Sequence, residues 1–441
     1  MKHRMYEEMK DSGVAWLGNI PAHWETLSLK RVLSSVEYGI SAPLMPSGEV
    51  AVLRMSNIQG GKVTLADVSY VDDVEPNLLL KENDLLFNRT NSLDLVGKVG
   101  IFRDSNLDKV SFASYLVRFR TKDGVDPQYL CYVLNIREIL ERARTMALPS
   151  ISQANLNPNR YGYIRICLPP IKEQRAIVAF LDKKTSEIDA FIQLKETQIE
   201  TLSMKRQTLI NQAMRRGLDP NVSLRTSGNT WLCDIPEHWE IVQLRRCISK
   251  FVDYRGKTPR KTDNGIPLIT AGAIRDGIIQ HERVPDYIAP EDYEEWMSRG
   301  FPKRGDVLLT TEAPLGETAQ IQDENIALAQ RVILFKVNPK KITNDYLKYH
   351  WLSPFGQGEL WRNATGSTAL GIKADRLYAT KVLLPPITEQ QHITSYLDRE
   401  TEHLGIVSQT IQDQIVKLRN FKDALISKAI TGKIDLREGQ Q

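Results

Sequence analysis

Two long segments of the chain carry apolar residues at intervals that alternate between three and four positions. The first segment begins at residue 171, and its periodic apolar positions are Ile188, Ile192, Ile199, Leu202, Leu209 and Ala213. The second begins at residue 387, and its positions are Leu404, Ile411, Ile415, Leu418, Leu425 and Ala429. A period of 3.5 residues is typical of a coiled-coil seam, so the pattern predicts two long helices. Four seam positions are polar: Lys195 and Arg206 in the first segment, and Ser408 and Lys422 in the second. Arg206 and Lys422 interrupt the seams at equivalent places, where a charge costs stability and can fix the register.

The ends of these helices are marked by local signals. A Pro-Pro pair precedes each helix, a glutamate lies in each first turn, and Gly217 and Gly432 follow the last periodic positions. At about 1.5 Å per residue, each helix would be roughly 60–65 Å long, and a helix of that length needs a partner. The simplest partner is the other helix, running antiparallel, which would bring the two chain ends together. Packing on the helix's own module or on another protomer is the alternative.

The rest of the chain alternates short β-rich runs with turn residues and helical patterns. In the first half the β-rich runs are 48–58, 83–90, 97–104 and 114–121, and the helical pattern is 126–146. In the second half the β-rich runs are 265–274, 305–312 and 330–339, and the helical pattern is 343–363. Each half therefore predicts a mixed α/β module.

The two halves are copies of one another at their edges. Residues 12–34 align with 227–249 at an offset of 215, with 12 of 23 positions identical, and 168–182 align with 384–398 at an offset of 216. The segments between these blocks are far less alike. A duplication that simply drifted would not spare the edges of each half, so we favour a shared frame that holds two modules with different roles.

These patterns together predict an α+β fold. Two mixed α/β modules are joined by two long antiparallel helices that form a coiled coil, with an internal pseudo-two-fold repeat. The predicted boundaries are residues 1–167 for the first module, 168–217 for the central helix, 218–383 for the second module, and 384–441 for the C-terminal helix and tail. The repeated tryptophans Trp16, Trp24, Trp231 and Trp239 are predicted to pack the start of each module onto the helices, and His23 and His238 to pack or hydrogen-bond beside them.

Composition narrows the class of protein. Of 441 residues, 41% are hydrophobic and 25% are charged, which is typical of a globular protein, and the net charge of +4 permits a polyanionic partner. No apolar run approaches the roughly 18 residues that span a membrane, and no secretory signal opens the chain, so we expect a cytoplasmic protein. The four cysteines are far apart and are interpreted as free thiols.

Polar residues in the turns of both modules are of the types that contact DNA bases and phosphates. The candidates in the first module are Arg54, Asn57, Asn88, Arg89, Thr90, Asn91, Gln153, Asn155 and Arg160. Those in the second module are Tyr254, Arg255, Lys257, Arg260, Lys261, Thr310, Thr311, Glu312, Asn363, Thr365, Lys373 and Arg376.

No catalytic residue and no metal site is predicted. The GKT at 256–258 lacks the first glycine of a phosphate-binding loop, because Phe251 occupies that position. NPNR at 157–160 lacks the second proline and the aromatic residue of an amino-methyltransferase motif, and the seven histidines show no ligand spacing.

Taken as a whole, the chain resembles the specificity subunit of type I restriction–modification systems. The resemblance is carried by WLGNIPAHW and WLCDIPEHW, by the two LPPIxEQ blocks that open long helices, and by TGKIDLR near the C-terminus. It implies that each module is a target recognition domain that reads one half of a bipartite site in double-stranded DNA, and that the helices set the unread gap. It also implies two methyltransferase subunits with S-adenosylmethionine, and motor-nuclease subunits that use ATP and magnesium, while this chain holds no cofactor.

Two other classes of protein remain as alternatives. A stand-alone DNA methyltransferase or nuclease fused to a specificity domain would need a catalytic motif, and a protein-binding scaffold would bind no DNA.

Overall fold

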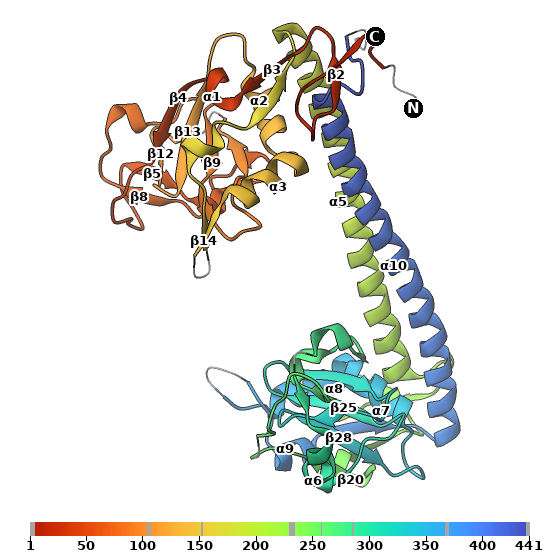
Figure 1. Ribbon diagram of the computed structural model, residues 1–441. Coiled ribbons are helices and arrows are strands. Elements are labelled where there is room, and N and C mark those ends of the chain that lie inside the picture. The colour runs from red at the N-terminus through yellow and green to blue at the C-terminus, as the bar shows by residue number, and fades with distance from the viewer. Residues whose placement is uncertain are drawn as a thin grey trace. The chain divides into compact units, whose positions relative to one another are not determined.

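The computed structural model describes residues 5–103, 107–150, 153–228, 234–256, 258–284, 286–366 and 370–437. Contacts within the chain divide it into two units (Figure 1). The first unit comprises residues 1–195 and 413–441, and the second comprises residues 196–412. Both divisions fall inside long helices, so each unit combines one α/β module with a part of each helix.

In the described part of the first unit, six strands form a sheet in the order β4-β13-β9-β11-β7-β6. These strands are β4 (Leu33–Tyr38), β13 (Leu116–Thr121), β9 (Leu85–Asn88), β11 (Val99–Ile101), β7 (Lys62–Val63) and β6 (Ile58–Gln59). A smaller sheet is formed by β12 (Val110–Phe112), β5 (Val50–Leu53) and β8 (Ser69–Val71). Leu53, Leu86 and Phe112 belong to a buried cluster formed by residues of both sheets. The β-rich runs predicted in this half all contain a strand.

The remaining elements of the first unit are short. The strands are β1 (Met9–Asp11), β2 (Asn19–Pro21), β3 (Glu25–Ser28), β10 (Thr90–Asn91), β14 (Leu148–Ser150), β15 (Gln153–Asn155) and β16 (Arg165–Leu168). The helices are α1 (Leu29–Val32), α2 (Pro127–Leu134), α3 (Arg137–Met146) and α4 (Pro158–Tyr161). The helical pattern predicted at 126–146 is divided into α2 and α3 because the Asn135 side chain turns back to bond the backbone of Val99 and Cys131.

The described part of the second unit is built around a sheet in the order β20-β28-β25-β26. Its strands are β20 (Ile248–Asp253), β28 (Val332–Val337), β25 (Val307–Thr311) and β26 (Leu315–Gln320). The smaller strands are β17 (Leu224–Arg225), β18 (Ile235–Pro236), β19 (Glu240–Gln243), β21 (Ile266–Ile269), β22 (Ile274–Arg275), β23 (Ile278–Ile279), β24 (Tyr287–Ile288), β27 (Ala327–Leu328) and β29 (Lys381–Leu384). The three runs predicted as strands in this half contain β21, β25 and β28.

Four short α-helices complete the described part of the second unit. They are α6 (Tyr293–Trp296), α7 (Asn344–Leu352), α8 (Pro354–Asn363) and α9 (Ala374–Ala379). The helical pattern predicted at 343–363 is divided at Ser353, whose hydroxyl accepts a hydrogen bond from the Gly356 backbone and caps α8, and Pro354 begins the new helix.

The two long helices are α5 (Ile171–Arg216) and α10 (Ile387–Ile430). Every apolar position of the predicted seams is buried or half-buried, which confirms the 3.5-residue period. In the first unit the end of α10 lies beside the residues before α5, as the hydrogen bond from the Cys167 thiol to the Ile430 carbonyl at 3.0 Å shows. Eight residues earlier on α10, Lys422 pairs with Asp189, which lies later in the chain on α5. The helices therefore run antiparallel there, as predicted, and Figure 1 shows them side by side.

Lys422 and Arg206, which are charged residues on the seams, each have a partner beside the seam. The Lys422 ammonium lies 2.6 Å from a carboxylate oxygen of Asp189, and the Arg206 guanidinium donates to the backbone carbonyl of Asp276 at 3.1 Å. Gly217 and Gly432 lie in the left-handed region after the helices, at φ of +73° and +70°. Among the described residues, no helix combines the length and the hydropathy that crossing a bilayer requires.

Candidate nucleic-acid interface

The glutamate in the first turn of each long helix holds the repeated tryptophan and histidine. Glu173 on α5 accepts hydrogen bonds from Trp24 Nε1 at 3.0 Å and from His23 Nε2 at 2.7 Å. In the second unit Glu389 on α10 accepts from Trp239 Nε1 at 3.1 Å and from His238 Nε2 at 2.7 Å. Trp24 and Trp239 are buried, so their predicted packing onto the helices is confirmed.

The other two tryptophans of the repeat stand apart from this contact. Trp16 is half-buried and lies against the guanidinium of Arg142, and Trp231 is outside the described residues. The described cysteines Cys131, Cys167 and Cys247 are free and buried, and burial raises the pKa of each thiol, to about 12 for Cys131 and Cys167. Their interpretation as free thiols is confirmed, and Cys233 is outside the described residues.

The glutamine that follows each glutamate holds the segment before α2 in the first unit and before α7 in the second. Gln174 is buried, donates to the carbonyls of Gly124 and Pro169, and accepts from the Asp126 backbone. Gln390 makes the equivalent bonds to Lys341, Pro385 and Thr343. The EQ pair of each LPPIxEQ block is thus a two-residue clamp. The glutamate holds the start of the module, and the glutamine holds the approach to α2 or α7.

A further repeated pair was missed in the sequence. Tyr132 on α2 donates to Asp182 on α5 at 2.6 Å, and Tyr349 on α7 donates to Asp398 on α10 at 2.7 Å. The signal was present, because Tyr-Leu-x-Tyr occurs at 129–132 and again at 346–349. It was hidden by the low similarity of the residues around it.

Five of the nine predicted polar residues of the first unit lie on or beside a small three-stranded sheet: Arg89, Thr90, Asn91, Gln153 and Asn155. β10 pairs with β15, and β15 pairs with β14, so Thr90 and Asn91 lie beside Ala154 and Asn155. Here β14 and β15 are called the first hairpin, and Figure 1 shows it projecting from the module. Arg89 donates to the Asn155 side chain at 2.9 Å, which joins two predicted residues separated by 66 positions.

The exposed side chains of β15 are polar, whereas β14 exposes the apolar residues Leu148 and Pro149. Gln153 and Asn155 are exposed, while Ala154 between them is buried. A two-stranded ribbon that presents amide side chains at alternate positions fits the width of the DNA major groove.

The second unit forms a comparable hairpin at the equivalent place. Thr365 and Gly371 exchange backbone hydrogen bonds of 2.8 and 3.0 Å, and Gly371 also pairs with Glu312, directly after β25. The segment between Thr365 and Gly371 is called the second hairpin, and its residues 367–369 lie outside the described residues. Arg255 donates to the Ile372 carbonyl at 2.8 Å while its guanidinium pairs with Asp253, so this arginine holds the base of the hairpin.

Six predicted DNA-contacting residues are buried. They are Asn57, Asn88, Thr90, Tyr254, Thr310 and Thr311. In four of them the polar side-chain atoms form hydrogen bonds inside the protein. Asn57 donates to Thr64 and Ala66, Tyr254 donates to Gly300, Thr310 accepts from the Glu317 backbone, and Thr311 donates to Arg331. For these four the structure replaces the predicted DNA contact with a structural role, because a buried and bonded group is not available to DNA. Burial also raises the pKa of Tyr254 to about 12.

Fourteen predicted residues are exposed or half-buried, and their DNA contacts stay predictions. The exposed ones are Gln153, Asn155, Arg160, Arg260, Lys261, Lys373 and Arg376. The half-buried ones are Arg54, Arg89, Asn91, Arg255, Glu312, Asn363 and Thr365. Some already have intramolecular partners: Arg54 donates to the Asp67 carbonyl, Lys261 pairs with Asp286, and Glu312 pairs with Arg331. Lys257 lies outside the described residues.

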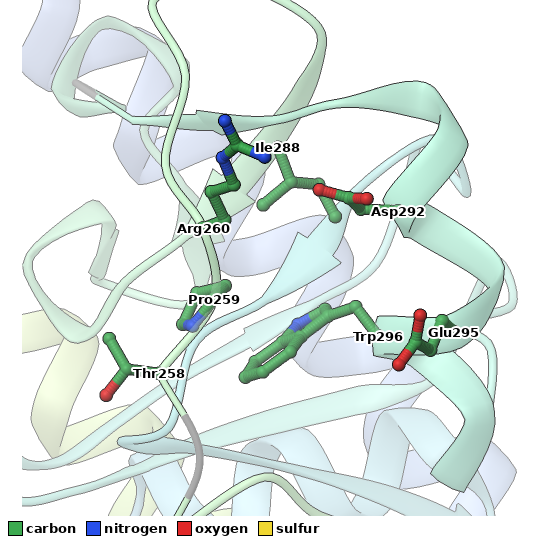
Figure 2. Close-up of a pocket in the computed structure, with 7 residues that line it drawn as sticks. All are labelled: Thr258, Pro259, Arg260, Ile288, Asp292, Glu295 and Trp296. Carbon is green, nitrogen blue, oxygen red and sulfur yellow. The ribbon is translucent and has the colours of Figure 1, made fainter.

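Arg260 lines a cavity of about 410 Å³ in the second unit. Figure 2 shows its guanidinium and the carboxylates of Asp292 and Glu295 around the Trp296 ring. The indole Nε1 donates to the Leu328 carbonyl at 3.0 Å, so the ring is fixed. Two carboxylates oppose a phosphate, so this cavity favours a cationic or mixed-charge group over the DNA backbone.

A buried ion network supports the first sheet instead of facing a ligand. Arg118 is fully buried, pairs with Glu37 and lies 3.8 Å from Asp84, and Arg120 pairs with Asp84 at 2.6 Å. Burial lowers the pKa of Arg118 to about 10. No group of three or more His, Cys, Asp or Glu side chains within the described ranges is arranged to hold a metal ion.

These observations define a class of protein in which each of two modules carries one hairpin, and each module is clamped to a long helix in the same way. The profile of the type I restriction modification DNA specificity domain matches this chain twice, at residues 21–202 and 236–417. The chain therefore belongs to that family.

Known relatives match most of its length. The type I restriction enzyme MjaVIII specificity subunit of Methanocaldococcus jannaschii is 26% identical, covering 83% of this chain and 83% of that protein. The type I restriction enzyme EcoKI specificity subunit of Escherichia coli K12 is 20% identical over 87% of this chain and 82% of that protein. A chain from a structural study of assembly and conformational transition of the type I restriction–modification system is 18% identical, with a TM-score of 0.68 over 94% of this chain and 99% of that chain. It supports the fold.

Proposed function

We propose that this chain is the DNA specificity subunit of a type I restriction–modification enzyme, and that each module reads one half of a bipartite target. The observation that supports this proposal most strongly is that the two units share the same contacts to the helices but carry different hairpins. The Glu–Gln clamp, the tryptophan and the Tyr–Asp contact are repeated, while the two hairpins carry different side chains. A frame that presents two hairpins with different side chains suits a target with two different halves.

The hairpins supply the base-reading groups in this proposal. In the first unit these are Gln153, Asn155 and Arg89, and in the second they lie around Glu312 and Thr365. Arg and Asn or Gln side chains make the bidentate contacts that distinguish guanine and adenine in the major groove. The exposed basic residues, among them Arg160, Lys373 and Arg376, would contact phosphates.

Catalysis in this proposal belongs to other subunits. Two methyltransferase subunits would bind the repeated frame and use S-adenosylmethionine to methylate adenines, and motor-nuclease subunits would use ATP and Mg²⁺ for restriction. This chain would direct both reactions by choosing the DNA site.

The decisive experiment expresses this chain with its methyltransferase partner in a host that lacks other adenine methylation. Methylation-sensitive sequencing should then show methylated adenines in a single motif of two short halves separated by an unread gap. Methylation without sequence preference would contradict the proposal, and so would a continuous, ungapped motif.

Arg89→Ala identifies which half the first module reads. We expect it to relax or weaken one position in one half-site by about 1–3 kcal/mol while the other half stays unchanged. Uniform weakening over all sequences with a flatter salt dependence would instead make Arg89 a phosphate contact.

A further inference from the structure

A cavity of about 530 Å³ adjoins the first hairpin. It lies between the turn that follows β10 and a short 3-10 helix, η1 (Met55–Asn57), with the strand after it. The lining residues are Met55, Ser56, Ile58, Gln59, Gly60, Asn88, Asn91, Leu95 and Lys98. Asn91 belongs to β10, which pairs with β15, so the cavity borders the sheet that carries the proposed base-reading residues.

Asn88 is the unusual member of this lining. Its side chain is 2% exposed, and its Oδ1 is buried with no hydrogen-bond partner among the described residues. A buried amide without a partner costs about 1–3 kcal/mol, and such groups in proteins call for a specific explanation. The backbone of Asn88 is satisfied, because its N–H donates to the Lys98 carbonyl and its carbonyl accepts from the Gly97 N–H, so the unsatisfied atom is the side-chain Oδ1.

Two other residues show that buried polar side chains at comparable places in this fold do form hydrogen bonds. Asn57, also buried and close to the cavity, uses its amide for bonds to Arg54, Thr64 and Ala66. At the matching position of the second unit, Thr310 accepts a bond from the Glu317 backbone at 2.9 Å. The Oδ1 of Asn88 has no equivalent partner among the described residues, and Asn88 lines a cavity. These two observations together point to a ligand as the partner.

The remaining lining indicates the kind of ligand. Met55, Ile58 and Leu95 offer apolar surface, Ser56, Gln59 and Asn91 offer hydrogen-bonding groups, and Lys98 contributes an ammonium group. None of these lining residues carries a carboxylate. A flat heterocycle with a donor–acceptor edge and a nearby phosphate matches this set, and an Asn amide can present both a donor and an acceptor to such an edge.

We propose that this cavity binds one nucleobase, unstacked from the DNA target that the first module reads. The proposal rests on the proposed function. Asn88 lies beneath the surface, so a base edge must enter the cavity to come within the roughly 3 Å of a hydrogen bond. A base that stays stacked and paired in the duplex cannot enter the cavity. An extruded base can enter it, at a cost of a few kcal/mol that the new contacts offset.

Asn88→Leu is the central variant, because Leu is close in size and removes the unpaired amide. If Asn88 serves only packing, the variant should be as stable as the wild type or more stable, and should bind DNA unchanged. If Asn88 holds a base, the complex with the methyltransferase should keep or gain thermal stability but lose affinity for its target by about 5- to 150-fold. The matched control is Gln280→Leu in the second unit, where the Gln280 Oε1 is also buried without a partner among the described residues and lies outside this cavity. It should leave binding unchanged.

A fluorescence experiment locates the base. Once sequencing has identified the half-sites, 2-aminopurine is placed at each position of the target in turn. In the wild-type complex, fluorescence should rise at one position in or beside the half-site that Arg89→Ala affects, and Asn88→Leu should remove that rise. Calorimetric titration of the complex with free nucleoside monophosphates forms the second arm. Binding there that Asn88→Leu abolishes, with no rise in DNA, would assign the same cavity to a free nucleotide.

The outcomes separate this inference from the proposed function. A complex without a bipartite preference overturns the proposed function. A complex with a bipartite preference whose target affinity, 2-aminopurine signal and nucleotide titrations are all unaffected by Asn88→Leu overturns only the nucleobase cavity.

Discussion

At the scale of single residues, Glu173 and Glu389 show how one side chain can hold the start of a whole module against a long helix. Each accepts bonds from a histidine and from a buried tryptophan, and Glu173 also accepts from the Tyr6 hydroxyl at 3.0 Å. Burial, with the nearby Glu173 charge as a smaller cause, raises the pKa of Tyr6 well above its ordinary value, so this hydroxyl remains a donor at neutral pH. From the sequence, these glutamates had been explained only by the helix dipole.

Removing the carboxylate should destabilise the unit that contains it. Glu173→Ala leaves the buried Trp24 N–H without its acceptor, and we expect the free energy of unfolding to fall by about 1–3 kcal/mol. Glu389→Ala should cost a similar amount through Trp239. Urea unfolding followed by tryptophan fluorescence measures both. Glu141→Ala, which removes only an exposed pair with Arg137, is the control and should change stability by less than about 0.5 kcal/mol. Equal effects of all three variants would contradict the clamp.

Acid should destabilise the second unit through His350. Its imidazole is buried, its Nε2 has no partner in the described part of the chain, and burial lowers its pKa to about 3. An unfolded histidine has a pKa of about 6.5. Between these values the unfolded chain binds a proton that the folded chain does not, so this contribution to stability is complete above pH 6.5 and is lost as the pH falls.

The test compares urea unfolding at pH 7.5 and pH 5.5. The wild type should lose about 1 kcal/mol more between these pH values than His350→Leu does. His392→Gln, at an exposed position on α10, should keep the wild-type dependence. The same acid sensitivity in His350→Leu and in the wild type would show that other groups cause it.

At the scale of elements, repetition and periodicity determined what could be predicted. The long helices were visible because a seam of 3.5-residue period extends over many turns. Strands such as β9 and β28 were visible because each contains an uninterrupted apolar run, at 85–87 and 332–335. The hairpin sheet was not predicted. Its strands are two or three residues long, too short for a pattern of alternation, and β10 pairs with β15 across more than sixty residues of chain. Pairing at that separation depends on the tertiary structure, which local sequence does not encode.

The charges on the seams can be tested element by element. Lys422 is half-buried and pairs with Asp189, whose side chain is 56% exposed, so the pair should contribute little. Lys422→Leu extends the apolar seam, and we expect the free energy of unfolding to rise by about 1 kcal/mol. Lys417→Leu, at an exposed position on the same helix, provides the comparison and should bring no gain. A clear loss of stability in Lys422→Leu, measured by thermal and urea unfolding, would show that the ion pair outweighs the seam.

At the scale of the whole molecule, the chain repeats its frame and varies what the frame carries. The repeated blocks contain both sides of the glutamate contact, because the tryptophan and histidine lie in one block and the glutamate lies in the other. This is why the frame was readable from sequence. The site was only partly readable. Amide and basic residues around 89–91 and 153–155 do meet, but Asn57, which is also an amide, is buried and bonded inside the protein. Only the tertiary structure distinguishes the two situations.

The continuous helices lead to a prediction about spacing. A heptad inserted into α5 after Lys195 and another into α10 after Gln412 would fall where the chain divides into its two units. Each insertion adds seven residues, or about 10 Å of helix, and keeps the seam nearly in register. In the proposed function the unread gap of the target should lengthen, by roughly three base pairs at 3.4 Å each. Both half-sites should stay the same, because the hairpins that read them are untouched.

Methylation-sensitive sequencing of the altered complex measures the gap and both half-sites together. A four-residue insertion in each helix is the control, because it breaks the 3.5-residue register and should reduce stability and activity together. A longer gap with unchanged half-sites would establish that spacing and reading are separate properties of this chain. A changed half-site, or an unchanged gap in a stable and active complex, would show that the helices do not set the distance.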